Sequence, residues 1–171
     1  SPEKSFRIIN EMIEQTKGNI LDKSYYFLLW GWIVVAGCLL HYILQHFELY
    51  AYPWHAWYIV ILGFILSFIR GFKTGKKQTV KTHIERIYLF VWISFGISYL
   101  ILLFFGEEIN YQYNSLIFIF AGNATFLSGY ILKFRPLMMG GILLWISSAV
   151  MFMTTGDAQL LIGAGGIILG Y

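Results

Sequence analysis

Charged residues are scarce in this chain of 171 residues: Asp, Glu, Lys and Arg make up 12% of it, whereas a soluble domain has about 25%. Hydrophobic residues make up 58% and aromatic residues 19%. So little charge cannot cover the surface of a soluble protein of this length. A surface that faces lipid needs no such cover, because lipid tails are as apolar as leucine. We therefore expect an all-α fold, a polytopic membrane helical bundle.

Cysteine is almost absent too, and the single Cys38 excludes an intrachain disulfide and a cysteine-based metal site. Because Cys38 lies within an apolar run, we expect it to be a small buried hydrophobe. A catalytic triad, a phosphate loop, an HExxH motif and paired carboxylates within a span are all missing. We therefore expect no catalytic residues and no cofactor, and an enzyme is the disfavoured class.

Three histidines and three glutamates could gather near one face of the protein. They are His41, His46, His55, Glu48, Glu107 and Glu108. Imidazole and carboxylate groups suit zinc or copper, but the spacing of these residues matches no ligand motif. We predict no metal site.

Lys and Arg are absent from every second connection between apolar runs. All twelve lie in three places. These are Lys4, Arg7, Lys17 and Lys23; then Arg70, Lys73, Lys76, Lys77, Lys81 and Arg86; then Lys133 and Arg135. The other connections contain Glu48, Glu107, Glu108 and Asp157. This is the positive-inside pattern of a multi-pass membrane protein, and it predicts a cytoplasmic N-terminus.

Six apolar runs predict six transmembrane helices. We expect them at 24–46, 54–72, 84–105, 115–132, 136–155 and from 158 to 171 and beyond. The last run has only ~14 residues, too few to cross a bilayer core of about 30 Å at 1.5 Å per residue. We therefore expect the natural chain to continue past residue 171 and to end in the cytoplasm.

Residues 1–22 form a separate N-terminal unit before the transmembrane bundle at 23–171. Apolar residues recur at helical spacing from Phe6 to Ile20, opposite a charged face, and Gly18–Asn19 suits a helix end. This pattern predicts an amphipathic interfacial helix on the cytoplasmic membrane face. Residues 2–18 would serve as an anchor or as a docking site for a cytoplasmic partner.

The spans also share a weak internal repeat. Trp32, Trp92 and Trp145 begin similar stretches in the odd spans, and Gly122 with Gly129 matches Gly163 with Gly170 in the even spans. The repeating unit would be a helical hairpin used three times. Such parallel repeats predict a bundle with a pseudo-threefold axis along the membrane normal, as in some transporters.

Ionisable residues are missing from the middle of every predicted span, which disfavours an ion-coupled pump. His41, near the end of the first span, is expected to be a hydrogen-bonded structural residue. The polar residues that could line a pathway or pocket are Asn123, Thr125, Ser94, Ser98 and His41, with Asn123 the amide we expect to be most buried. The other role of such groups is to join helices by hydrogen bonds.

Two functions follow. The first is a small transporter or channel-like protein for a neutral or weakly polar solute. The alternative is a non-transporting scaffold or sensor that binds a cytoplasmic partner through residues 2–18 and the basic loop 73–86. Lys73, Lys76, Lys77 and Lys81 of that loop are the expected lipid or partner contacts. Expected partners are the lipid bilayer, anionic head groups at the cytoplasmic face, and a second copy or a cytoplasmic protein. Nucleic acid is not expected.

The opening of the chain carries a resemblance. Glu3-Lys4, Asn10-Glu11-Met12-Ile13 and Tyr25-Tyr26-Phe27-Leu28-Leu29-Trp30-Gly31-Trp32 resemble the corresponding stretches of uncharacterised small six-span bacterial inner-membrane proteins. The resemblance covers mainly the first ~45 residues and then the general six-span plan. It implies a multi-pass protein of the bacterial inner (plasma) membrane and no particular activity.

Overall fold

The computed structural model describes residues 2–75, 83–106, 108–109 and 112–170, with side chains at 24–73, 86–106, 108–109 and 112–170. These residues form helices and no strand. The helices are α1 (Pro2–His46), the 3-10 helix η1 (Pro53–Tyr58), α2 (Ile59–Gly75), α3 (His83–Phe104), α4 (Tyr113–Ile131), α5 (Arg135–Phe152) and α6 (Ala158–Gly170). The all-α expectation is confirmed for this part of the chain.

Five segments of the described residues are long and apolar enough to cross a membrane. They are Ser24–His46, Pro53–Lys73, Arg86–Phe104, Tyr113–Ile131 and Arg135–Phe152. Each agrees closely with a span expected from the sequence. The second begins as a 3-10 helix because Pro53 occupies its first turn, a common arrangement at helix ends. The sixth helix, α6, has 13 residues.

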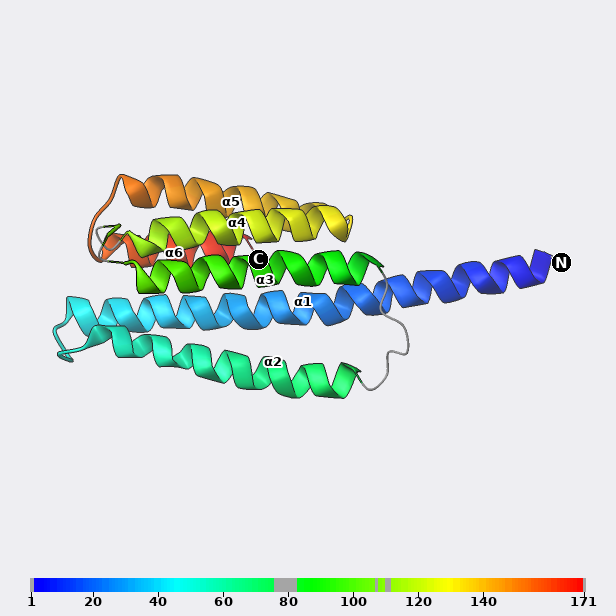
Figure 1. The fold of residues 1–171 in the computed structure, drawn as a ribbon, viewed down its shortest axis with the longest axis horizontal. Helices are drawn as coiled ribbons and strands as arrows, with labels where there is room; N and C mark the ends of the chain where they lie inside the picture. The colour runs from blue at the N-terminus through cyan, green and yellow to red at the C-terminus, as the bar shows by residue number, and fades with distance from the viewer. Residues whose placement is uncertain (1, 76–82, 107, 110–111, 171) are drawn as a thin grey trace.

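The first helix is longer than the sequence pattern suggested. α1 runs without a break from Pro2 to His46, so the helix end expected at Gly18–Asn19 was wrong. A glycine inside a helix costs only about 1 kcal/mol relative to alanine and an asparagine less, which the surrounding helix formers can offset. The N-terminal segment therefore continues the axis of α1 beyond the end of the bundle (Figure 1).

Consecutive helices pack as three hairpins, α1 with α2, α3 with α4, and α5 with α6. Between hairpins, α4 packs on α5 and α6 packs on α1, whereas the described parts of α2 and α3 do not pack on each other. The threefold ring suggested by the repeat is therefore open on one side, and α2 diverges from α1 there (Figure 1). The repeated tryptophans differ accordingly: Trp32 is 67% exposed, whereas Trp145 packs on Phe126.

Glycine explains why α4 and α5 approach most closely. A methyl group at Gly141 would lie 2.7 Å from the backbone nitrogen of Phe126 and 2.9 Å from the carbonyl oxygen of Gly122. A methyl group at Gly122 would lie 2.5 Å from the indole ring of Trp145. The two backbones are thus in contact, as small residues allow between apolar helices.

Close contact at glycines also joins α5 to α6, but it is absent around Gly96 of α3. A methyl group at Gly140 would collide with the carbonyl oxygen of Gly170, and one at Gly166 would collide with the hydroxyl of Ser147. Around Gly96 of α3, by contrast, nothing lies within 4 Å of where a methyl group would be. The open side of the ring therefore lacks close helix contact.

A hydrophobic core lies between α1, α4, α5 and α6, beside the buried hydroxyls of Ser115, Thr125, Ser128 and Ser148. Its buried residues are Val35, Cys38, Phe118, Leu144, Met151, Ala164 and Ile167. Cys38 is 3% exposed, as expected for a small buried hydrophobe. Only 11% of the apolar stretch of α2 and 6% of that of α3 are buried, compared with 33–39% in α1, α4 and α5. α2 and α3 therefore form the periphery of the bundle.

We expect Gly141→Ala to lower the free energy of unfolding by about 1–3 kcal/mol, because the added methyl group must push two backbones apart. The matched control is Gly96→Ala, which adds the same group to open space and removes a flexible glycine from a helix. It should leave stability unchanged or raise it by up to about 1 kcal/mol. SDS titration of the purified protein in detergent, followed by tryptophan fluorescence, measures both. Equal effects at the two positions would contradict this account of α4–α5 packing.

Candidate functional site

The structure does not bring the residues of the predicted polar pathway together. Asn123 is exposed on the outer surface of the bundle, so the expectation that it is buried was wrong. Thr125, two residues further along α4, is fully buried. Two residues correspond to roughly 200° around a helix, so these two side chains cannot share a face. Ser94 is exposed on α3, and Ser98 is partly buried.

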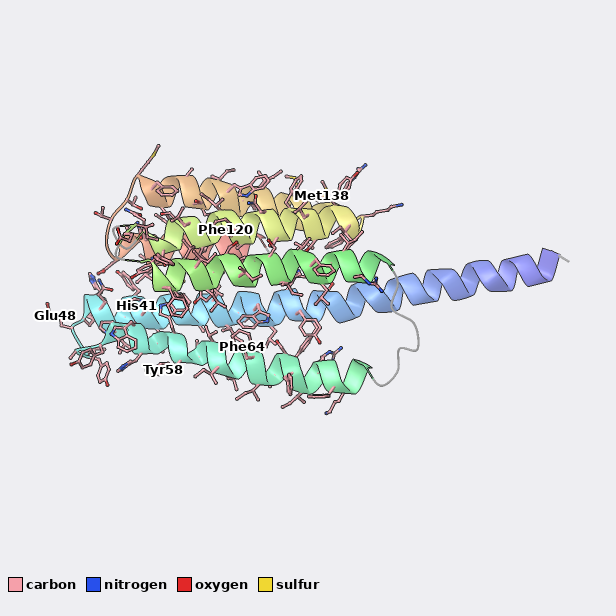
Figure 2. The ribbon with its side chains drawn as sticks, viewed as in Figure 1. His41, Glu48, Tyr58, Phe64, Phe120 and Met138 are labelled. Carbon is pink, nitrogen blue, oxygen red and sulfur yellow. The ribbon has the colours of Figure 1, made fainter. Side chains whose placement is uncertain are left out.

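His41 lies at the end of the bundle opposite to Met138 (Figure 2), and its side chain has a hydrogen-bond partner there. The indole nitrogen Nε1 of Trp57 donates a hydrogen bond to Nδ1 of His41 over 3.0 Å. An indole N–H can only donate, so Nδ1 must carry no proton and accept. His41 thus fastens η1 to α1, which is the structural role expected for it.

The buried hydroxyl group of Ser148 joins two helices in the same way, whereas that of Ser128 is buried without a hydrogen-bond partner. The Oγ of Ser148 in α5 donates to the backbone carbonyl oxygen of Ser115 in α4 over 2.7 Å, and both residues are buried. Hydrogen bonds of this kind between apolar helices are worth roughly 0.6–2 kcal/mol. This hydrogen bond therefore holds α5 against α4.

An amide cluster that the sequence reading missed joins the ends of α4, α5 and α6. Gln159, 7% exposed, donates through Nε2 to Oε1 of Gln112 at 3.2 Å. The same nitrogen lies 3.0 Å from the carbonyl oxygen of Met151 and 2.9 Å from that of Thr154. Its Oε1 accepts from Nδ2 of Asn114 at 3.3 Å. We call these residues the amide clamp.

The amide clamp ties the residues that follow α5 to the start of α6. Gln159 donates to the carbonyl oxygen of Met151, in the last turn of α5, and to that of Thr154, two residues after that helix. The backbone N–H of Thr154 also donates to the Met151 oxygen. A signal was present in the sequence, since Gln159 is the one side chain with a hydrogen-bonding group in Ala158–Gly170. The clamp satisfies its own polar groups, so it offers little to a solute.

The described charges separate to the two ends of the bundle. At one end, the basic end, lie Arg70, Lys73, Arg86, Lys133 and Arg135. The guanidinium of Arg70 in α2 lies 4.3 Å from the ring centre of Tyr25 in α1, which brings α2 close to the first span there. Lys73 is exposed, as a lipid or partner contact requires. Lys76, Lys77 and Lys81 lie outside the described residues.

The opposite end, the acidic end, contains Glu48, Glu108 and Asp157 (Figure 2 labels Glu48). Nδ1 of His46 lies 3.4 Å from Oδ2 of Asp157, which links the end of α1 to the α5–α6 connection. Among the described residues, no group of three or more His, Cys, Asp or Glu side chains is placed to hold a metal ion. The polar contacts at this end therefore connect helices.

Charged residues also occupy two helix-ending turns. Phe134 N–H donates to the carbonyl oxygen of Gly129 at 2.8 Å, and Lys133 N–H donates to that of Tyr130 at 3.2 Å. This pattern is a Schellman turn, whose left-handed residue is usually glycine. Here that residue is Lys133, with a φ of 53°. Glu48, with a φ of 50°, has the same place after α1.

We expect Gln159→Leu to lower the free energy of unfolding by about 1–3 kcal/mol, because Asn114 and Gln112 lose their hydrogen-bond partner in α6. The matched control is Asn123→Leu, which replaces an exposed amide on an apolar surface. It should leave stability unchanged or raise it slightly. The same SDS titration measures both variants. A larger loss for Asn123→Leu than for Gln159→Leu would show that the buried amide has been assigned to the wrong residue.

Comparison with known proteins adds no assignment. No protein-family model, no curated protein and no solved structure matches this chain. Fold likeness alone would in any case not define an activity, because function resides in the chemistry of a site. The packed core, the amide clamp and the two oppositely charged ends are therefore the observations from which function has to be argued.

Proposed function

We propose that this chain is an integral membrane protein that does not transport a solute and that holds a cytoplasmic partner through its N-terminal helix and its basic end. The observation that carries the proposal is the filling of the core. Valine, phenylalanine, leucine, methionine and isoleucine side chains occupy the space between α1, α4, α5 and α6. The polar side chains buried beside this cluster are small hydroxyls and one amide, and those of Ser148 and Gln159 donate hydrogen bonds to other parts of the bundle.

Membrane insertion is supported by the bundle's outer surface. Phe64, Phe68, Phe90 and Phe104 are each at least 60% exposed on α2 and α3. A soluble monomer rarely exposes apolar patches larger than a few hundred Å². The separation of basic and acidic ends, with the five apolar segments between them, fits helices that cross a bilayer. By the positive-inside rule, the basic end faces the cytoplasm.

The N-terminal helix would then project into the cytoplasm. Residues 2–22 continue α1 beyond the basic end over about 30 Å, at 1.5 Å per residue. Their sequence is amphipathic, and an amphipathic helix outside a bundle has an apolar face available for a groove in a partner. Coupling of this helix to the first span without a break would transmit a partner's position directly to the bundle.

The transport alternative rests on Thr125, Ser98 and the other small polar residues of the spans. Thr125 is fully buried, Ser148 is hydrogen-bonded within the bundle, and Asn123 points outward. These placements favour helix packing as the role of the polar residues. They leave the scaffold or sensor function as the one that the geometry supports best.

Water access to the core tests the first half of the proposal. Single cysteines at Thr125 and Ser148, in a Cys38→Ala background, should not react with a membrane-impermeant thiol reagent in intact cells or in inverted vesicles. Thr155→Cys, exposed at the acidic end, is the control and should react from one side only. Labelling of Thr125→Cys from either side would restore transport as the leading function.

Crosslinking tests the second half. A benzophenone amino acid in place of Ile13 on the N-terminal helix should form a covalent adduct with a cytoplasmic protein in living cells. The same probe in place of Glu48 at the acidic end should not. In the proposed topology the two positions lie on opposite faces of the membrane within the same protein, so position 48 serves as the control. Adducts with lipid alone from position 13 would count against a protein partner and in favour of a membrane anchor.

A further inference from the structure

A half-open surface cavity of ≈ 330 Å³ lies at the basic end, between the start of α3 and the end of α4, and Tyr130 in its wall is 70% exposed. Its lining residues are Ile87, Tyr130, Ile131 and Lys133. Ile87 and Ile131 are aliphatic, whereas Tyr130 carries a phenol and Lys133 an ammonium group. Ligand cavities in proteins have volumes of about 300–1,000 Å³, mostly apolar walls and a few polar groups that orient the ligand.

The charged side chains that the structure describes around this cavity are cations, and Glu85 precedes Arg86 in the sequence. Lys133 belongs to its lining, Arg86 precedes Ile87 on α3, and Arg135 follows two residues after Lys133. All three cations are exposed. The described carboxylates Glu48, Glu108 and Asp157 lie at the opposite end of the bundle. A ligand with a negative head therefore meets attraction here from both α3 and the α4–α5 connection.

We propose that this cavity binds one anionic phospholipid, with its phosphate at Lys133 and Tyr130 and an acyl chain against Ile87 and Ile131. The proposal rests on the membrane insertion and orientation proposed above. Basic pockets between spans on the cytoplasmic side bind anionic lipid head groups. The ammonium and the phenol both donate hydrogen bonds, and a phosphate accepts them.

A zwitterionic lipid fits the same place less well. Its phosphate would bring a quaternary ammonium or amine next to Lys133, Arg86 and Arg135, where like charges repel. A free phosphate would match the ammonium but would leave the aliphatic wall of Ile87 and Ile131 without a partner. The combination of an apolar wall and a cationic rim therefore selects an amphiphile with net negative charge.

The turn that holds Lys133 makes a sharp test possible. Because Lys133 has the left-handed conformation that glycine adopts without strain, Lys133→Gly removes the ammonium and keeps the turn. The matched control is Lys73→Ala at the end of α2, which removes an exposed cation from the same end of the bundle but not from the cavity. Unfolding in SDS should show that both variants remain folded.

The experiment uses the full chain, purified in detergent and stripped of lipid, with native mass spectrometry to count bound phosphatidylglycerol or phosphatidylcholine. The unmodified protein should retain one phosphatidylglycerol in preference to phosphatidylcholine. Lys133→Gly should weaken retention of phosphatidylglycerol about fivefold, the effect of one membrane-facing cation, and Lys73→Ala should leave it unchanged. Ile87→Trp, which fills the apolar wall, should weaken it as well.

Three results would overturn the proposal. These are equal retention by the unmodified protein and Lys133→Gly, an equal loss in Lys73→Ala, and equal retention of phosphatidylcholine. Displacement of the lipid by glycerol phosphate at equal concentration would assign the site to a free phosphate. If the protein binds lipids without selectivity but still resists carbonate extraction from membranes, the lipid site is refuted and the proposed membrane insertion stands. Extraction by carbonate would refute the proposed membrane insertion.

Discussion

The direct contact between the backbones of α4 and α5 is the interaction on which the rest of the bundle depends. Gly122 and Gly141 leave room for the main chains to touch, and the indole ring of Trp145 covers the contact. α5 then offers Gly140 to Gly170 of α6. On α6, a methyl group at Gly163 would lie 3.5 Å from the sulfur of Cys38 in α1. α4, α5, α6 and α1 are therefore joined in turn through glycines.

Most of the buried polar side chains in this packing are small hydroxyls of α4 and α5. In a lipid environment helices gain little from burying apolar surface against each other, so close van der Waals contact and internal hydrogen bonds must hold them. Ser148 and Gln159 supply such hydrogen bonds, and His41 ties η1 to α1. Their polar groups are satisfied by the protein itself, which moves the chemistry available to partners to the two ends.

The two peripheral helices, α2 and α3, pack less extensively on the rest of the bundle than the other α-helices do among the described residues. α2 is held by α1 and η1, and α3 by α4, and neither packs on the other in the described residues. A ring contact between Trp30 and Phe64 contributes to the attachment of α2 to α1, and one between Phe27 and Trp92 brings α3 against α1 as well. At these interfaces the glycines face side chains and not backbone: a methyl group at Gly63 of α2 would lie 2.6 Å from the Cδ1 of Ile33 in α1. The open side between α2 and α3 leaves the basic ends of both helices accessible.

The sequence by itself determined the helical class, the positions of five apolar segments and the separation of charge, because each depends on local composition. A run of about 20 apolar residues can satisfy its backbone in lipid only as a helix, whatever surrounds it. It also determined Cys38 as a buried residue, since an unpaired cysteine in an apolar run is usually buried.

Only the tertiary structure decided which side of each helix faces inward. α4 has small or polar residues on two sides, Gly122 with Thr125 and, roughly 200° from Thr125, Asn123. Sequence periodicity cannot choose between two such faces, because either could pack. The choice came from the glycines of α5, which fit the backbone at Gly122. The amide clamp and the cavity at Lys133 likewise join residues far apart in the chain, and only packing brings them together.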